Sequence, residues 1–290
     1  MARVGFVGLG NMGAPMARNV AAGGHELVLH DADPGVVTRL AAELGATAAT
    51  GSADFAGVDA VVTMLPTSKV VAAALFDWDG GVPPHLAPGT VVIDMSSSDP
   101  TQTLELGERL RGHGVDLVDA PVSGGVPRAA AATLSIMLGG DSDAALDKAV
   151  PIIETMSSTI FRTGKLGTGH AMKALNNFVA AAALTASCEA LITGERFGLD
   201  PHLMVDVLNT STGQSFSSLH VLSEHVVDKK YATGFGLALI TKDVGIAEAL
   251  HSEMHHDAPV ARAVLASLNE ALAELGPVDH SAAMQYWEKQ

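Results

Sequence analysis

The sequence has very little cysteine: Cys188 is the only one in 290 residues. A single cysteine excludes an internal disulfide, so the fold cannot be a disulfide scaffold, and a reducing, cytoplasmic location is expected. Cys188 lies in the apolar stretch AAALTASCEALI. This setting predicts a buried structural thiol.

Positive charge is also scarce. Lysine and arginine total 17 against 32 aspartate and glutamate residues, which gives a formal net charge of −15. Nucleic acids and anionic membranes recruit basic patches, so both are excluded as expected partners. Any anionic ligand must therefore be held by backbone amides and a few well-placed cations.

Long uninterrupted apolar runs are missing as well. None reaches the roughly 18 residues that a membrane span needs, and the N-terminal MARVGFVGLGNMG breaks into glycines where a signal peptide stays apolar. No membrane association is expected. Charged residues make up only 17% of the chain and hydrophobic residues 48%, which favours ordered domains with buried cores over disorder. The length suits two domains.

The first part of the chain alternates short apolar, β-branched runs with helical patterns. Such runs, bounded by turn residues, are typical of buried parallel strands, and their alternation with helices predicts a doubly wound α/β sheet of the Rossmann type over residues 1–164. The expected strands are 2–8, 25–31, 59–65, 90–96, 115–121, 134–140 and 158–164. The expected helices are 11–22, 34–44, 68–76 and 101–112.

The pattern changes after Gly169. Residues 171–198 contain no proline and are rich in alanine and leucine, which predicts one long helix. Only helical patterns follow, at 201–209, 215–227, 236–255, 259–275 and 281–288. We therefore expect an all-helical substrate and oligomerisation domain over 165–290, joined to the first domain by a long interdomain helix.

A glycine-rich turn follows the first predicted strand. Gly8, Gly10 and Gly13, with Asn11 and Met12 between them, match the dinucleotide-binding pattern G-x-G-x-x-G in its proper place between a strand and a helix. The three glycines allow a tight turn, close approach of the backbone to a pyrophosphate, and packing of helix on strand. The alternative is a glycine-rich turn without a ligand.

Asp31 ends the second predicted strand, 18 residues after Gly13. A carboxylate there accepts hydrogen bonds from the ribose hydroxyls of NAD and repels the 2′-phosphate of NADP. The next basic residue along the chain is Arg39. NAD is thus the expected cofactor; the alternative is that Asp31 only begins the turn DADPG.

Lys173 and Asn177 lie four residues apart on the predicted long helix and therefore share a face. A desolvated lysine can exchange a proton near neutral pH, which makes Lys173 a candidate general acid or base. A solvated surface lysine is the alternative. His170, one turn earlier, is interpreted as a helix-end residue.

A second glycine motif, APVSGG over residues 120–125, follows a predicted strand directly and contains Ser123, Gly124 and Gly125. A serine hydroxyl and glycine amides can form a nest for a substrate carboxylate. The alternative is a tight turn with no ligand.

Taken together, these segments resemble the β-hydroxyacid dehydrogenases, the family of 3-hydroxyisobutyrate dehydrogenase and tartronate semialdehyde reductase. The resemblance spans nearly the whole chain. The matching segments, in order, are GFVGLGNMGAPMARNV (5–20), MLPTS (64–68), DMSSSDP (94–100), DAPVSGG (119–125), GTGHAMKALNN (167–177) and GFGLALITKDVGIA (234–247).

The resemblance implies an NAD-dependent oxidoreductase that interconverts a small β-hydroxyacid and its semialdehyde or ketone by hydride transfer. It implies Lys173 as the general acid/base with Asn177 orienting it, and Ser123, Gly124 and Gly125 around the substrate carboxylate. It further implies cofactor contacts from Leu65, Pro66, Ser97 and Lys242. Members of the family commonly form dimers or tetramers, so a homodimer or homotetramer is expected.

Two stretches depart from the family pattern. Ala132 stands where many members have glycine, a difference for which we expect little consequence. Residues 211–218 match no specific substrate class, so 3-hydroxyisobutyrate, 3-hydroxypropionate, serine, glycerate and longer or sulfonated analogues all stay open.

Alternative functions come from different classes. An imine reductase would share the fold, but these enzymes usually lack lysine at the position of Lys173. A non-catalytic NAD-binding protein is the other alternative, and the Lys173–Asn177 pair argues against it. His251 and His255 have the spacing of zinc ligands on a helix, but no third ligand pattern accompanies them, so no metal is expected.

Overall fold

The computed structural model describes residues 1–290, which form two compact units, Met1–Lys173 and Ala174–Gln290. The boundary between the units falls inside one helix, α7 (Thr168–Phe197). The expected domain boundary after residue 164 stays a prediction. Each unit is described by itself below.

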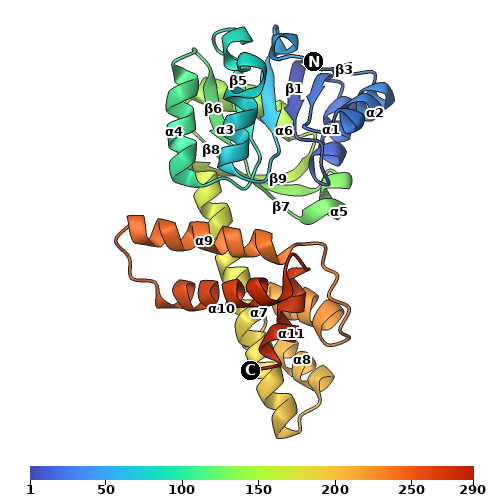
Figure 1. The fold of residues 1–290 in the computed structure, drawn as a ribbon, viewed down its shortest axis with the longest axis vertical. Helices are drawn as coiled ribbons and strands as arrows, with labels where there is room; N and C mark the ends of the chain where they lie inside the picture. Colours follow the sequence, from blue (N-terminus) through green and yellow to red (C-terminus); the bar gives the residue numbers. More distant parts are fainter. The chain divides into compact units, whose positions relative to one another are not determined.

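The first unit is built on one nine-stranded sheet (Figure 1). Its strand order begins β3-β2-β1-β4-β5-β6, with every neighbouring pair parallel. This is the Rossmann order, which confirms the predicted fold class. β8 then pairs antiparallel with β6 and β7, and parallel with β9. The strands are β1 (Arg3–Val7), β2 (Glu26–His30), β3 (Thr47–Ala48), β4 (Ala60–Thr63), β5 (Val91–Asp94), β6 (Asp116–Asp119), β7 (Val122–Ser123), β8 (Leu134–Gly140) and β9 (Ser157–Gly164).

Helices cover both faces of this sheet (Figure 1). Side chains of α1, α2 and α6 join the core on one face, and those of α3 and α4 join the core on the other. The helices of the first unit are α1 (Gly13–Ala22), α2 (Pro34–Leu44), α3 (Ser68–Phe76), α4 (Pro100–Arg111), α5 (Gly125–Ala130) and α6 (Asp143–Ile153), with short 3₁₀ turns η1 (Ser52–Phe55), η2 (Trp78–Gly80) and η3 (Pro83–His85).

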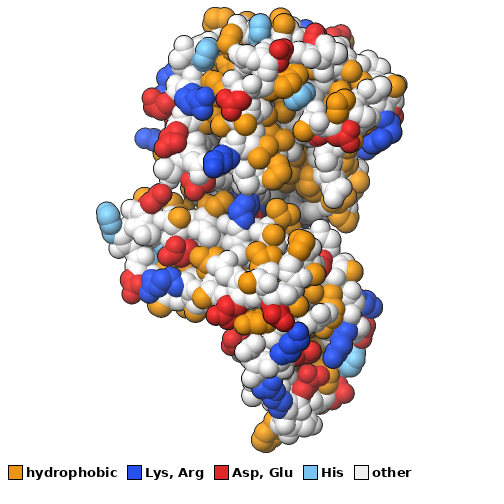
Figure 2. All heavy atoms as spheres, viewed as in Figure 1, with side chains coloured by type: hydrophobic (Ala, Val, Ile, Leu, Met, Phe, Trp, Pro, Cys, Tyr) orange, Lys and Arg blue, Asp and Glu red, His pale blue; other side chains and the backbone are white.

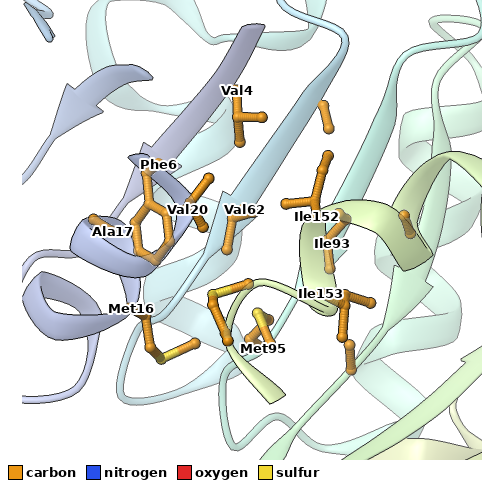
Figure 3. Close-up of a cluster of buried hydrophobic side chains, with 14 of the residues drawn as sticks. Val4, Phe6, Met16, Ala17, Val20, Val62, Ile93, Met95, Ile152 and Ile153 are labelled. Carbon is orange, nitrogen blue, oxygen red and sulfur yellow. The ribbon is translucent and has the colours of Figure 1, made fainter. Parts of the chain in front are cut away.

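The two cores follow from the alternation of side chains along buried strands. Phe6 contributes to the α1 side of the sheet and Val7 to the opposite side. Because both faces are covered, both residues are apolar, as expected for parallel strands. Figure 3 shows the first of these cores, in which Val4, Phe6, Val62 and Ile93 of the strands gather with Met16, Ala17 and Val20 of α1 and Ile152 and Ile153 of α6.

Three helices begin at an Asp-Pro pair. Asp33, Asp99 and Asp200 each cap a helix by accepting a hydrogen bond from an amide of the first turn, and each is followed by proline at the first helical position. Proline suits that position because its missing N–H would have no partner inside the helix. This local chemistry explains why the starts of α2 and α4 agree with the predicted ranges to within one residue.

The second unit is helical throughout. Its core gathers apolar side chains around Cys188 and Leu191 of α7, and includes Trp287 near the C-terminus. Besides its part of α7 it contains α8 (Pro201–Thr210), the π-helix η4 (Ser217–Val226), α9 (Leu237–Glu253), α10 (Pro259–Leu275), the 3₁₀ turn η5 (His280–Ala283) and α11 (Met284–Trp287).

Helix α7 is long and apolar enough to cross a membrane by length and composition alone. The sequence contains no uninterrupted apolar run of that length, because threonine, serine and glutamate interrupt the stretch. One such helix is weak evidence, since core helices pass the same test.

Ala132 precedes β8 with φ of +55°, in the left-handed region. The position where the resemblance leads us to expect glycine is therefore one where a side chain is strained, and the substitution has a consequence that sequence reasoning did not foresee. The left-handed conformation costs an L-residue about 1–2 kcal/mol. Glycine loses more conformational entropy on folding than alanine does. This loss reduces the gain in stability from replacing Ala132 by about 0.5–1 kcal/mol.

We expect Ala132→Gly to raise the free energy of unfolding by up to about 1 kcal/mol. Ala131→Gly is the matched control, because Ala131 has φ of −85° and should lose about 0.5–1 kcal/mol. Urea unfolding followed by Trp78 fluorescence in a Trp287→Phe background reports on the first unit. If the free energy of unfolding fell equally in both variants, the proposed strain at Ala132 would be contradicted.

Candidate active site

The topology of the sheet points to one edge. From β1 the chain proceeds to β2 and β3 on one side, and then returns to place β4 on the other side of β1. Ligands of such sheets bind at this switch point, outside the carboxyl ends of the strands. The segments that follow β1, β4 and β5 are the predicted cofactor loops.

Two of the three motif glycines are required by the packing of the protein itself. Gly8 has φ of +97°, and a Cβ there would overlap the backbone oxygen of Met64 after β4. A Cβ on Gly13, the first residue of α1, would overlap the backbone oxygen of Gly8. Both glycines therefore allow the close contact of helix, loop and strand that the pattern predicted.

Gly10 is different, because a Cβ there would meet no protein atom within 4 Å. Gly10 and Asn11 are exposed and Met12 is half-buried, and Met12 caps α1 without a side-chain hydrogen bond. The first turn of α1 thus offers amides and the positive end of a helix dipole beside open space. These residues fit the pyrophosphate of a dinucleotide.

Asp31 directly follows β2 and reaches back to the glycine loop. Its Oδ2 accepts a hydrogen bond of 2.6 Å from the Leu9 amide, and its Oδ1 accepts one of 2.9 Å from the Asp33 amide. The hydrogen bond from the Asp33 amide belongs to the turn that Asp31 begins. The hydrogen bond from the Leu9 amide connects the same carboxylate to the glycine loop, where the cofactor is expected. Each oxygen keeps a lone pair for a ribose hydroxyl.

The segments after β4 and β5 are joined to each other. The Leu65 amide donates to Ser96 Oγ at 2.9 Å. Asp94, at the end of β5 and fully buried, accepts hydrogen bonds from the hydroxyls of Thr63 and Ser98, both at 2.8 Å. These bonds fix the loops on which the predicted cofactor contacts lie.

Leu65 and Pro66 lie immediately beyond β4, and Ser97 lies beyond β5. Ser97 is half-buried, whereas Ser96 and Ser98 on either side are buried and bonded inward. The structure therefore places all three predicted residues at the carboxyl edge of the sheet, and Leu65 beside the glycine loop.

The predicted substrate motif begins in β7, which ends at Ser123. Gly124 and Gly125 follow with φ of +135° and +65°. Two successive positive φ values form a turn that glycine adopts without strain, and the amides of such a turn are available to line an anion-binding concavity. Ser123 and Gly124 are half-buried and Gly125 is exposed.

Lys173 is half-buried and lies in the second turn of α7, at the end of the first unit. The start of α7 is held at the sheet edge by Asp119, the last residue of β6. Its carboxylate accepts hydrogen bonds from the Gly167 and His170 amides, both at 2.8 Å. The amine of Lys173 is therefore carried by a helix that begins at the carboxyl end of the strands.

Asn177 lies one helical turn further, in the second unit, and is 6% exposed. Its amide nitrogen donates to Asp243 Oδ2 at 2.6 Å, and Lys242 Nζ lies 3.0 Å from Asp243 Oδ1. Asp243 of α9 is buried and thus orients two predicted site residues at once. The motif K-D was noted in the sequence, but the role of its aspartate was missed.

His170 was also missed as a structural centre. It is 1% exposed, and its ring contacts Thr103 and Ser96 between the carboxylates of Asp94 and Asp119. Both aspartates open motifs that follow strands, DMSSSDP and DAPVSGG. The position of these two aspartates at the ends of neighbouring parallel strands is the sequence feature from which this buried cluster could have been predicted.

Two other expectations concern side chains away from these loops. Cys188 is fully buried, and burial raises the pKa of its thiol, which agrees with a structural role. Around His251 and His255 no group of three potential ligands stands close enough together to hold a metal ion.

Comparisons with known proteins cover both units. Residues 3–164 match the NAD binding domain of 6-phosphogluconate dehydrogenase, and residues 167–287 match the model described as NAD-binding of NADP-dependent 3-hydroxyisobutyrate dehydrogenase. The NAD-dependent L-serine dehydrogenase of Pseudomonas aeruginosa is 36% identical over 86% of this chain and 85% of its own length.

The chain belongs to the 3-hydroxyisobutyrate dehydrogenase family. Another member, the 2-(hydroxymethyl)glutarate dehydrogenase of Eubacterium barkeri, is 33% identical over 99% of this chain and 95% of its own. The solved 3-hydroxyisobutyrate dehydrogenase of Mycobacterium tuberculosis with L-serine superposes with a TM-score of 0.90 at 33% identity, covering 99% of both chains. Family membership confirms the resemblance and the NAD-binding fold predicted from the sequence.

Imine reductases share the architecture of this family. That of Streptomyces aurantiacus superposes with a TM-score of 0.65 at 18% identity, covering 99% of this chain and 100% of its own. Such a likeness shows the fold alone, so the choice between C=O and C=N chemistry depends on the site residues.

Proposed function

We propose that this protein is an NAD-dependent dehydrogenase that interconverts a small β-hydroxyacid and its semialdehyde or ketone. The observation that carries this proposal is the position of Lys173, an amine on a helix whose start is fixed at the carboxyl edge of a dinucleotide-binding sheet. An acid/base group at that edge suits proton transfer coupled to hydride transfer.

The glycine loop and Asp31 would hold the cofactor, and bound NAD would supply the hydride acceptor for oxidation of the alcohol. Lys173 in its neutral form takes the hydroxyl proton, and the C–O bond becomes a carbonyl. In reduction the lysine ammonium returns a proton to the carbonyl oxygen.

Ser123 and the amides of Gly124 and Gly125 bind the substrate carboxylate in this proposal. Anchoring at the carboxylate orients the alcohol, and such positioning can lower a barrier by several kcal/mol. Asn177, held by Asp243, orients Lys173 in this proposal, and the family resemblance assigns Lys242 to cofactor binding.

The relatives narrow the substrate class. L-Serine, 2-(hydroxymethyl)glutarate and 3-hydroxyisobutyrate, the compounds in their names, all have a hydroxymethyl group on the carbon that bears a carboxylate. We therefore propose a 3-hydroxy acid with a primary alcohol as the substrate.

NAD⁺ reduction by the purified protein over a panel of C3–C5 hydroxyacids tests this function, with cyclic imines and NADH as the competing panel. Turnover of at least one hydroxyacid is expected. Turnover of imines alone would favour the imine reductase, and cofactor binding without any turnover would favour a non-catalytic NAD-binding protein.

Asp31 is expected to make the enzyme prefer NADH over NADPH. Asp31→Asn keeps an oxygen acceptor for the Leu9 amide but removes the charge that repels a 2′-phosphate. We expect the ratio of kcat/KM for NADH to that for NADPH to fall about tenfold, the size of one screened charge pair. A native enzyme that prefers NADPH would contradict the assignment.

We also propose that the protein works in the cytoplasm as a homodimer or homotetramer, binding neither nucleic acid nor membrane. Hydrophobic side chains reach the visible surface of the helical unit (Figure 2), and Val179 and Phe197 of α7 are 63% and 86% exposed. Only 33% of the most apolar 18-residue window of α7 is buried, and contiguous exposed apolar surface favours self-association. Light scattering coupled to size exclusion would show a monomer if this is wrong.

A further inference from the structure

The side chain of His170 lies between two buried carboxylates in the first unit. Nε2 is 3.7 Å from Asp94 Oδ2, and Nδ1 is 3.8 Å from Asp119 Oδ2. All three side chains are at most 1% exposed. Three ionisable groups buried together in a region of low dielectric constant require a specific arrangement of protons.

The hydrogen bonds of the ring indicate that arrangement. Nε2 lies 3.1 Å from the Ser96 carbonyl oxygen, which can only accept, so Nε2 carries a proton. Nδ1 lies 2.8 Å from Thr103 Oγ1, and that hydroxyl also lies 2.9 Å from the Asp99 carbonyl oxygen.

The single hydroxyl proton of Thr103 cannot serve both Nδ1 and the Asp99 carbonyl. If Nδ1 carries a proton as well, it donates to Thr103 Oγ1, and Thr103 donates onward to Asp99. Every bond is then satisfied, and the resulting positive charge faces the carboxylates of Asp94 and Asp119. A doubly protonated ring therefore keeps both contacts of the Thr103 hydroxyl, whereas with a neutral ring the Asp99 carbonyl would keep only the hydrogen bond from the Thr103 amide.

The same contacts join the parts of the site. Ser96, whose carbonyl accepts from the ring, accepts at Oγ from the Leu65 amide, so the segments after β4 and β5 are both connected to His170. The Asp119 carboxylate accepts hydrogen bonds from the backbone amides of Gly167 and His170 at the start of α7. Lys173 follows His170 by three residues on that helix.

We propose that His170, as a buried imidazolium between Asp94 and Asp119, is a positioning residue that fixes α7, and with it Lys173, against the loop after β5. This rests on the proposed function only where Lys173 is concerned. Positioning matters because a shift of about 1 Å at a reacting group can cost two orders of magnitude in rate.

The titratable groups that contact the ring are Asp94 from β5 and Asp119 from β6; α4 contributes the neutral Thr103. Burial raises the pKa of Asp119, while the charge of His170 and the backbone amides oppose that rise. The charge of His170 therefore lowers the pKa of Asp119 relative to burial alone, and removing it should favour protonation of Asp119.

Nitrogen-15 NMR of the histidine-labelled, cofactor-free protein tests the charge directly. The His170 signals are assigned by their absence in His170→Gln or, should that variant not fold, by their shift in Thr103→Val. We expect both ring nitrogens to be protonated at neutral pH. A neutral ring with one protonated nitrogen would overturn the proposal whatever the activity.

Kinetics test the positioning. His170→Gln keeps a donor for the Ser96 carbonyl but no charge, and we expect kcat to fall about tenfold or more while the KM for hydroxyacid and the Kd for NADH change less than about threefold. Thr103→Val removes one partner of the ring and should give a smaller fall of the same kind. His85→Gln, at an exposed histidine, is the matched control.

The outcomes separate the two proposals. If the native protein oxidises no hydroxyacid, the proposed function fails, while the NMR signals still decide the protonation state of His170. If the native protein turns over hydroxyacid and His170→Gln matches its kcat, the positioning role fails alone. If His170→Gln lowered the melting temperature but left kcat unchanged, His170 would contribute to stability only, and the positioning role would also fail.

Discussion

Replacing Lys173 with alanine is expected to lower kcat by about 10²–10⁴, the usual loss when a general acid/base is removed. The reason is that no other titratable group is assigned to the hydroxyl proton in the proposed site. Because the pyrophosphate and ribose are held elsewhere, by the glycine loop and Asp31, the Kd for NADH should change little. Steady-state oxidation of the best hydroxyacid, with NADH binding followed by fluorescence, measures both quantities.

Lys165→Ala is the matched control for this loss. Lys165 lies just before α7, and its side chain is exposed, so removing it changes the net charge equally without touching the proposed site. We expect its kcat to stay within about twofold of the native value, as for surface substitutions generally. Near-normal turnover by Lys173→Ala would refute the assignment of the acid/base.

Gly10→Ala is expected to weaken NADH binding about ten- to a hundredfold without lowering stability. The added methyl group meets no protein atom within 4 Å, so the fold has room for it. It would occupy the space through which the loop backbone approaches the pyrophosphate. Titration of NADH and thermal unfolding of the cofactor-free protein measure the two effects separately.

Gly13→Ala, by contrast, is expected to lower the stability of the cofactor-free protein. Its Cβ would overlap the backbone oxygen of Gly8, so the loop must move even without cofactor, and a loss of about 1–3 kcal/mol of stability is expected. If Gly10→Ala bound NADH as tightly as the native protein, the cofactor would not lie against this loop.

The elements that could be predicted from the sequence are those whose signals are local. α2 and α3 have the predicted bounds, because an Asp-Pro pair starts the first and Thr67 caps the second through the Val70 amide. Strands with apolar side chains on both faces were equally clear. The glycine and lysine motifs pointed to their loops because each lies where a strand meets a helix.

The elements that were missed have weak local signals. β3 and β7 have two residues each, too few for any alternation to show. α6 was not predicted, and it contains Pro151 within its last turn, which interrupts the helical pattern. Residues 215–227 were predicted as an ordinary helix, whereas η4 is a π-helix.

The missed site residues depend on contacts between distant segments. His170 meets Ser96 and Asp119 across 74 and 51 residues, and Asp243 meets Asn177 across 66. A histidine near a helix start looks like a surface residue until the strands that flank it are in place. Only the fold shows that its neighbours are carboxylates.

The central claim is that the amine of Lys173 exchanges the proton that accompanies hydride transfer. A single-turnover experiment tests it most directly, by mixing enzyme, NAD⁺ and the best hydroxyacid and following NADH absorbance for the native protein and for Lys173→Met. The account predicts that the hydride-transfer phase slows at least about a hundredfold in Lys173→Met while NAD⁺ still binds normally. An unchanged single-turnover rate in that variant would contradict it.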